Sequence, residues 1–178
     1  MVMGPVTKVL LQFERAIWPE CLALLPCPQG PVTLYWPVFF GARSERPSVL
    51  SAYATGPRAA RLSTMTDEEV AAACSEDLDR LFPGNAARSL LRGFQRIDWA
   101  ADELACGGYS FIGPGGTGSR HKLAAADTGA LFWAGSATVS APIAATVEGA
   151  YASGLRAAAE VVEHLDAGPP AAAVDAAP

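Results

Sequence analysis

Runs of β-branched and aromatic residues predict three strands in the first third of the chain. Residues Val6 to Phe13 are apolar on both faces, which predicts an inner strand of a sheet. Val32 to Phe40 is a second, more aromatic run, and Pro37 within it favours an edge strand or a bulge because proline has no N–H to donate. Val49 to Thr55 predicts a third, shorter strand, which Gly56-Pro57 ends.

The clearest helix spans Thr66 to Phe82. Thr66 and Glu69 have the spacing of a capping box, in which each side chain accepts a hydrogen bond from the other residue's backbone N–H. One face of this helix is apolar and includes Val70, Cys74 and Leu78. That face is expected to lie in the core.

The second half of the chain has shorter strand signals and one long helix. Arg92 to Trp99, Gly107 to Ile112 and Leu131 to Ala134 are strand-like, and the chain from about Pro142 to Leu165 has the composition of a long helix. Strands, a helix, further strands and a closing strand–turn–helix predict a mixed α/β or α+β fold. Residues Ala167 to Pro178 are rich in Ala and Pro without periodicity, and we expect a disordered tail there.

Two glycine-containing turns resemble ligand-binding loops at first sight, but only the second fits such a role. The loop from Gly113 to Gly118 lacks the Gly-Lys-Ser/Thr ending of a phosphate loop, and we expect it to open no helix. The strand that ends at Gly135 is followed by small residues and a helix start, which would place free backbone N–H groups at the edge of a sheet. Many α/β proteins have such a unit without binding a ligand there, so this pattern alone leaves the question open.

The composition is more apolar than that of an average soluble domain. Of the 178 residues, 51% are hydrophobic and 17% are charged. Either the core is generous, or some apolar surface normally meets another chain or domain. The net charge is −5 and the 13 basic residues form no cluster, so neither nucleic acid nor an anionic membrane is predicted as a partner. No apolar run is long enough for a membrane span, the N-terminus has no signal-peptide pattern, and we expect a cytoplasmic protein.

The four cysteines, at positions 21, 27, 74 and 106, form no Cys-x-x-Cys pair. The spacing of Cys21 and Cys27 is typical of no zinc site. We therefore expect reduced thiols, with Cys74 on the core face of its helix, and no metal site.

Three stretches together resemble the flavin-containing amine oxidases, a family that includes monoamine, polyamine and L-amino acid oxidases and flavin-dependent histone demethylases. In the first, Lys8 lies in a strand that is followed by Phe13-Glu14-Arg15 and Trp18. The second is Trp99 followed by Gly107-Gly108-Tyr109-Ser110-Phe111. The third, the most specific, is Leu131 to Thr138 followed by Ala145 to Ala158. Their order and spacing are similar to the family's over roughly residues 1–165.

The resemblance implies a division of the chain into three parts. Residues 1–113 would be a portion of the substrate domain, a mixed sheet with the Thr66–Phe82 helix packed on it. Residues 114–166 would supply the strand and long helix that close a Rossmann-like FAD-binding domain. Residues 167–178 would be the tail.

The resemblance also implies two catalytic residues. Lys8 would hydrogen-bond a water beside flavin N5, where its ammonium stabilises the negative charge that builds during the reaction. Tyr109 would flank the substrate amine as an aromatic wall. From the pattern alone, Lys8 is a strand lysine with a packed stem and Tyr109 a core aromatic. The region of a frequent second aromatic wall is Ala145-Thr146 here, and both residues are small.

Five residues are implied to bind the cofactor. Trp99 would contact the flavin ring, or else it packs in the core. The other four would hold the flavin through backbone N–H groups at a helix start, namely Gly135, Ser136, Thr146 and Val147. The alternative is that these residues are small because they pack closely at the start of the helix. The family usually has Glu where this chain has Ser136. Gly108 stands where monoamine oxidases have a flavin-linked Cys, so FAD would be bound non-covalently.

We expect no Gly-rich stretch of this sequence to form the family's Gly-x-Gly-x-x-Gly fingerprint, which follows a strand, opens a helix and binds the ADP end of FAD. We therefore expect an incomplete FAD site and an N-terminal FAD-binding half or subunit as partner, with an amine and oxygen as substrates. The alternative is a truncated, non-catalytic remnant or interaction subunit with no activity of its own.

Overall fold

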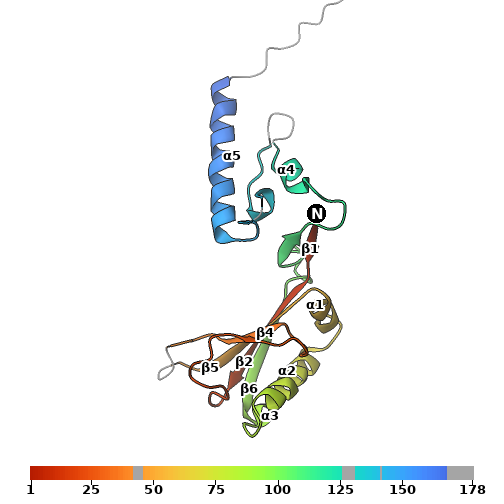
Figure 1. Ribbon diagram of the computed structural model, residues 1–178, viewed down its shortest axis with the longest axis vertical. Coiled ribbons are helices and arrows are strands. Elements are labelled where there is room, and N and C mark those ends of the chain that lie inside the picture. The colour runs from red at the N-terminus through yellow and green to blue at the C-terminus, as the bar shows by residue number, and fades with distance from the viewer. Residues whose placement is uncertain (42–45, 126–130, 141, 168–178) are drawn as a thin grey trace, which may run out of the picture. The chain divides into compact units, whose positions relative to one another are not determined.

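The computed structural model describes residues 1–41, 46–125, 131–140 and 142–167. The chain forms two compact units, one made of Met3–Tyr109 and the other of Met1–Val2 with Ser110–Pro178 (Figure 1). Both helices and strands are present, so the predicted mixed fold class is confirmed. Of the predicted tail at residues 167–178, Ala167 is helical, so the prediction was wrong there, and residues 168–178 lie outside the described residues.

The Met3–Tyr109 unit is built on an antiparallel sheet of five strands. Their spatial order is β3 (Leu25–Pro26), β4 (Leu34–Pro37), β5 (Ser48–Thr55), β2 (Val6–Phe13) and β6 (Leu91–Asp98). β2 lies between β5 and β6, so the prediction of an inner strand there is confirmed. β4 is shorter than the predicted strand and ends at Pro37, and only the two residues of β3 pair with its outer side.

Alternation along β2 separates a core face from an open face of the sheet. Val9, Leu11 and Phe13 are buried, whereas Lys8 and Gln12 on the other face retain exposure. Helices α1 (Pro57–Leu62), α2 (Asp67–Leu81) and α3 (Ala87–Leu90) lie on one side of the sheet (Figure 1). The apolar face of α2 joins the odd-numbered residues of β2 in the core, so these three helices lie on the face opposite Lys8.

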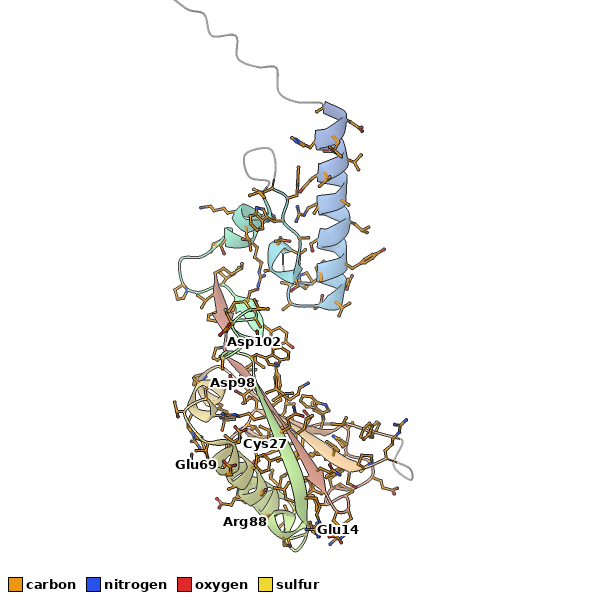
Figure 2. The ribbon with its side chains drawn as sticks, turned by 180° about the vertical axis from the view of Figure 1, so that it is seen from behind. Glu14, Cys27, Glu69, Arg88, Asp98 and Asp102 are labelled. Atoms are coloured by element: carbon orange, nitrogen blue, oxygen red, sulfur yellow. The ribbon has the colours of Figure 1, made fainter. Side chains whose placement is uncertain are left out.

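The predicted cap and core face of α2 are confirmed. Thr66 Oγ1 accepts a 3.2 Å hydrogen bond from the N–H of Glu69, whose carboxylate accepts one of 2.8 Å from the N–H of Thr66. Figure 2 shows Glu69 at the beginning of this helix. Cys74 is fully buried, and the Tyr35 hydroxyl donates a 3.0 Å hydrogen bond to Asp77, which ties α2 to β4.

The chain passes between the units through β1 (Val2–Gly4) and β7 (Tyr109–Phe111), which pair as a two-stranded sheet. The second unit then contains α4 (Ser119–Ala124), a 3₁₀ turn η1 (Ser136–Thr138) and α5 (Val147–Ala167). The expectation that the Gly113–Gly118 loop opens no helix was wrong. Gly118, with φ of 81°, allows the chain to turn directly into α4. Gly113, Gly115 and Gly118 also have the Gly-x-Gly-x-x-Gly spacing between β7 and α4, so the expectation that no such stretch follows a strand and opens a helix was wrong as well, although α4 has only six residues.

Two element predictions in the second unit need correction. Leu131 forms a single β-bridge and residues 132–134 have no regular structure, so the predicted strand Leu131–Ala134 was wrong. A strand requires a hydrogen-bonded neighbour, and no described strand pairs with this segment beyond the bridge. The long helix was predicted from about Pro142 but begins at Val147, because Ala145 has a left-handed φ of 62° that a helix does not accommodate.

α5 has two unlike long faces. Small residues such as Gly149, Ser153 and Ala157 are buried against the rest of their unit. Large apolar residues on another face are exposed, namely Val147, Tyr151, Leu155, Val162 and Leu165. This stripe favours the second interpretation of the apolar composition, a surface that meets another chain or domain. In the described ranges no helix combines the length and apolarity that a membrane span requires.

Candidate functional site

A hollow of about 460 Å³ in the Met3–Tyr109 unit brings together three of the predicted site residues. Lys8 comes from the central strand, Trp99 from the loop after β6, and Tyr109 from the start of β7. The other lining residues are Met3, Val6, Tyr53, Ala105, Gly107 and Gly108. Segments about ninety residues apart in sequence therefore converge on one space.

The register of the sheet places Lys8 on the open face. It lies opposite Tyr53 on β5 and opposite Ile97 on β6. Its ammonium nitrogen lies 5.3 Å from the centre of the Trp36 ring, within the range of a cation–π interaction. Lys8 is the one charged side chain among the described residues that line the hollow.

Two aspartates shape the loop that carries Trp99 toward Tyr109. Asp98 Oδ1 accepts a 3.1 Å hydrogen bond from the backbone N–H of Ala100. Asp102 Oδ1 accepts hydrogen bonds of 3.0 and 2.7 Å from the backbone N–H groups of Leu104 and Ala105. Figure 2 shows both carboxylates where β6 gives way to this loop. The backbone N–H of Trp99 donates to the Val6 carbonyl at 3.0 Å, which holds the backbone of Trp99 beside the hollow.

Close packing explains the two glycines before Tyr109. The N–H of Gly108 donates to the Gly4 carbonyl at 2.9 Å, and a Cβ added at Gly108 would lie 2.3 Å from Val6 Cγ2. Gly107 has φ of 139°, and a Cβ there would lie 2.7 Å from the Gly4 oxygen. This backbone accommodates no side chain at Gly108, the position where a linking thiol would stand.

Tyr53 belongs to the hollow and was not among the predicted residues. Burial raises the pKa of its phenol, and a hydrogen bond with the Tyr109 side chain raises that pKa further. Tyr53 was missed because the sequence predicts the strand Val49–Thr55 but does not show that this strand pairs with the one that carries Lys8. The available signal was one large tyrosine among the small residues of Ser51-Ala52-Tyr53-Ala54-Thr55, opposite the strand that carries Lys8.

The chemistry of this lining fits a flavin ring. Aromatic side chains and glycine backbone offer flat, apolar surfaces to a planar ring, and the Lys8 ammonium provides a positive charge beside it. Tyr109 and Trp99 are 50% and 40% exposed in this chain, so both have surface left for such a contact.

The other predicted cofactor-binding residues lie in the Ser110–Pro178 unit. The N–H of Gly135 donates to Ser153 Oγ at 2.8 Å, and its carbonyl accepts bonds from the N–H and hydroxyl of Thr138. Arg120 donates to the carbonyls of Ser136 and Ala137 at 3.5 and 3.1 Å. Because both polar backbone atoms of Gly135 are engaged, this glycine shapes the turn and offers no free N–H to a ligand.

Thr146 and Val147 form the beginning of α5. Thr146 Oγ1 accepts a 3.0 Å hydrogen bond from the N–H of Gly149 and thereby caps the helix. The Ala145 N–H donates to the Ser136 carbonyl at 3.4 Å, which brings the turn at Gly135 and Ser136 next to this helix start. The first N–H groups of a long helix lack intrahelical acceptors and carry partial positive charge, so they fit an electronegative cofactor group. Among the described residues, no cluster of His, Cys, Asp and Glu side chains is arranged to hold a metal ion.

A family model described as flavin containing amine oxidoreductase matches residues 1–162 of this chain. The chain belongs to the flavin-containing amine oxidoreductase family. The match includes the whole Met3–Tyr109 unit, the other unit as far as residue 162, and all seven predicted site residues.

Curated relatives agree with this family. The chain is 30% identical over 178 residues to "Possible lysine-specific histone demethylase 1" of Drosophila melanogaster, a match that covers 90% of this chain and 19% of that protein. It is 32% identical over 135 residues to "Polyamine oxidase 1" of Oryza sativa subsp. japonica, covering 68% of this chain and 26% of that one. The chain thus spans about a fifth to a quarter of the length of these relatives.

Solved structures share the fold. The cyclohexylamine oxidase from Brevibacterium oxydans IH-35A superposes with a TM-score of 0.73 at 24% identity, over 92% of this chain and 36% of that chain. A putrescine oxidase bound to putrescine gives a TM-score of 0.71 at 22% identity, over 89% of this chain and 35% of that one.

Proposed function

We propose that this chain is the C-terminal part of a flavin-dependent amine oxidase and that it completes an FAD site together with an N-terminal FAD-binding half. The observation that carries the proposal is the convergence of Lys8, Trp99 and Tyr109 on one hollow. Membership of the flavin amine oxidoreductase family supports it. The chain covers only 19–36% of the relatives and structures named above, which supports the need for a further half.

The reaction is the oxidation of an amine at the carbon that bears nitrogen. The carbon–hydrogen bond breaks with both electrons leaving as hydride, the nitrogen lone pair forms the carbon–nitrogen double bond, and loss of an N–H proton gives the neutral imine. FAD, when bound, supplies the acceptor for the hydride, and the hydride and the proton released from nitrogen together end on oxygen as hydrogen peroxide.

The residues of the hollow have distinct tasks in this proposal. Tyr109 presents its ring as a wall that orients the amine and keeps water away from it. Lys8 places a positive charge where negative charge develops on the acceptor side, which lowers the barrier electrostatically. Trp99 provides a flat apolar surface at the rim.

The second unit contributes backbone groups. The free N–H groups at the start of α5, beginning at Val147, would hold electronegative atoms of the cofactor, with Thr146 and Ser136 beside them. The Ser136 hydroxyl would donate or accept a hydrogen bond where the resemblance to the family implies a carboxylate. Binding would be non-covalent at Gly108, since glycine has no thiol.

We propose an amine as the class of substrate and no particular amine. The named relatives and structural neighbours include a histone demethylase, a polyamine oxidase, a cyclohexylamine oxidase and a putrescine oxidase. These proteins differ in substrate while sharing the oxidised carbon–nitrogen unit, so a panel of primary, secondary and polyamines and amino acids is the appropriate probe.

The test is to produce the chain together with a candidate N-terminal half that carries the Gly-x-Gly-x-x-Gly fingerprint. The purified assembly is expected to retain flavin after desalting and to release peroxide with at least one amine, whereas neither part does so alone. An assembly that retains flavin but oxidises no amine in the panel would identify a non-catalytic interaction subunit. A chain that assembles with no such half would be a remnant.

A further inference from the structure

We propose that Trp36 and Tyr53 are the positioning residues of the hollow, Trp36 holding the Lys8 ammonium in place and Tyr53 connecting that pair to Tyr109. Their relevance to amine oxidation rests on the function proposed above. The contacts themselves belong to the Met3–Tyr109 unit and are measurable in this chain.

The sheet brings these residues onto one face by register. Tyr53 is paired with Lys8 on β2 and with Leu34 on β4. Trp36 lies two residues along β4 from Leu34, so its side chain emerges on the same open face. The Trp36 and Tyr53 rings lie 5.7 Å apart at an angle of 56°, and the Lys8 ammonium lies 5.3 Å from the Trp36 ring centre.

The partner of Lys8 is a ring and not a carboxylate. None of the ion pairs among the described residues includes Lys8. A carboxylate would fix the ammonium and also neutralise its field, whereas the face of an indole attracts the cation and adds no net charge. Trp36 therefore restrains Lys8 while leaving its positive charge available to the reacting atoms.

Tyr53 links this pair to the proposed substrate wall. Tyr53 and Tyr109 line the same hollow, and their side chains interact by a hydrogen bond. The Tyr109 ring is half exposed, so packing alone restrains it weakly. The link to Tyr53, which is itself packed on Trp36, fixes the direction in which the Tyr109 ring faces.

The Trp36 contact is tested by NMR on the lysine side chains. The chain has two lysines, Lys8 and the exposed Lys122, so a chain labelled with ¹³C at the lysine Cε gives two signals and an internal reference. The Lys8 ε-protons are expected upfield of those of Lys122 because of the Trp36 ring current. Trp36→Leu should move them to the Lys122 position, and Trp36→Phe should restore part of the shift.

Trp133→Leu, in the other unit, is the matched control and should leave both lysine signals in place. Coincident Lys8 and Lys122 signals in the parent, or a Lys8 signal unmoved by Trp36→Leu, overturns the role of Trp36. Unchanged backbone amide shifts across β2 and β5 separate loss of the ring from loss of the fold.

The Tyr53 link is tested with tyrosine labelled at the ring carbon that bears oxygen. Tyr53→Phe keeps the ring that packs on Trp36 and removes the hydroxyl, so it should shift the Tyr109 signal and leave the Lys8 ε-signal unchanged. Tyr151→Phe on exposed α5 is the control and should move neither. A Tyr109 signal indifferent to Tyr53→Phe overturns the link.

Kinetics of the assembled oxidase give the second readout. Trp36→Leu is expected to lower kcat roughly tenfold with little change in KM, consistent with loss of one cation–π contact. Tyr53→Phe is expected mainly to raise KM. If the parent assembly oxidises no amine, the proposed function fails, while the NMR shifts still decide whether Trp36 and Tyr53 hold Lys8 and Tyr109. Parent-like kcat and KM in both variants would reduce their role to packing and overturn the proposal.

Discussion

Gly108 lies so close to Val6 that a Cβ added at Gly108 would be 2.3 Å from Val6 Cγ2 and 2.6 Å from its Cβ. Valine is stiff about χ1, so its methyl groups do not move aside easily. The N–H of Gly108 donates a hydrogen bond to the Gly4 carbonyl, which holds the two backbones together. Val6 and Gly108 thereby form part of the wall of the hollow that Tyr109 also lines.

Gly108→Ala is therefore expected to destabilise the Met3–Tyr109 unit by about 1–3 kcal/mol, the usual cost of overpacking. Gly93→Ala is the matched control, because a Cβ at Gly93 meets no atom within 4 Å, and a change of about 0.5 kcal/mol or less is expected. Urea unfolding of both variants measures the difference. Equal stabilities would mean that Val6 gives way without cost.

Alkaline pH should destabilise the same unit through the core around α2. Burial raises the pKa of the Cys74 thiol from 9.0 to about 12, and burial likewise raises the pKa of the Tyr35 phenol above its ordinary value. Between pH 9 and 12 the unfolded chain therefore loses protons that the folded chain retains, so stability is full below about pH 9 and falls as the pH rises.

Cys74→Ala is expected to flatten this fall while costing about 1 kcal/mol at neutral pH for the small cavity left behind. Cys106→Ala, at an exposed position, should keep the parent's slope. The measurement is the urea midpoint between about pH 8 and pH 11 for all three chains. A Cys74→Ala chain as alkali-sensitive as the parent would place the effect on Tyr35.

Local patterns were sufficient to predict the central elements of the fold. β2 has the predicted bounds, β5 begins one residue earlier, and the capping box of Thr66 and Glu69 marks the start of α2. These patterns are alternation of apolar residues, helical periodicity and reciprocal capping, and each is contained within the sequence of a single helix or strand. Short helices such as α1, α3 and α4 carry too few residues for periodicity, and the left-handed Ala145 that delays α5 has no residue-type signal.

The site was predictable only in part. Lys8, Trp99 and Tyr109 followed from a resemblance, and the structure places them around one hollow. Tyr53 and Trp36 require the register between three strands, which no single segment of sequence contains. The segment Leu131–Ala134 has strand propensity but forms no strand, because no described strand lies beside it to supply the hydrogen bonds.

Lys8→Met should slow flavin reduction or reoxidation in the assembled oxidase by an order of magnitude or more. The expectation follows from removing a positive charge beside the reacting atoms, since such a group typically contributes a few kcal/mol. Stopped-flow absorbance of the flavin measures both half-reactions. Lys122→Met removes the other lysine, which is exposed on α4, and should behave like the parent. Parent-like rates in Lys8→Met would return Lys8 to the role of a packed strand lysine.

Tyr109→Ala should impair amine turnover more than flavin retention. The ring is proposed to orient the amine, so its loss raises KM and lowers kcat/KM, while the backbone that closes on Gly4 remains. Tyr109→Phe keeps the aromatic wall but loses the bond to Tyr53, so it should retain kcat and raise KM as Tyr53→Phe does. Steady-state peroxide release and flavin content after desalting give the two quantities. Equal losses of flavin and turnover in Tyr109→Ala would assign Tyr109 to cofactor binding.

The isolated chain should bind FAD weakly or not at all and should oxidise no amine. Much of the contact area of FAD lies at its pyrophosphate and adenine, which a glycine-rich loop at the start of a long βαβ helix holds, whereas the Gly113–Gly118 loop of this chain opens only the six-residue helix α4. The groups that remain, around Lys8 and at the start of α5, reach only the flavin end. The exposed stripe from Val147 to Leu165 on α5 should also make the isolated chain associate with itself.

Three measurements check this expectation: flavin colour after desalting, peroxide with the amine panel, and mass by light scattering over a range of concentrations. Replacing Leu155 and Val162 by Gln should lower the self-association without changing the Met3–Tyr109 unit, because both side chains are exposed and belong to the other unit. The same double variant should weaken assembly with an N-terminal half, if that half covers the stripe. Tight FAD binding and amine turnover by this chain alone would refute the requirement for a second half.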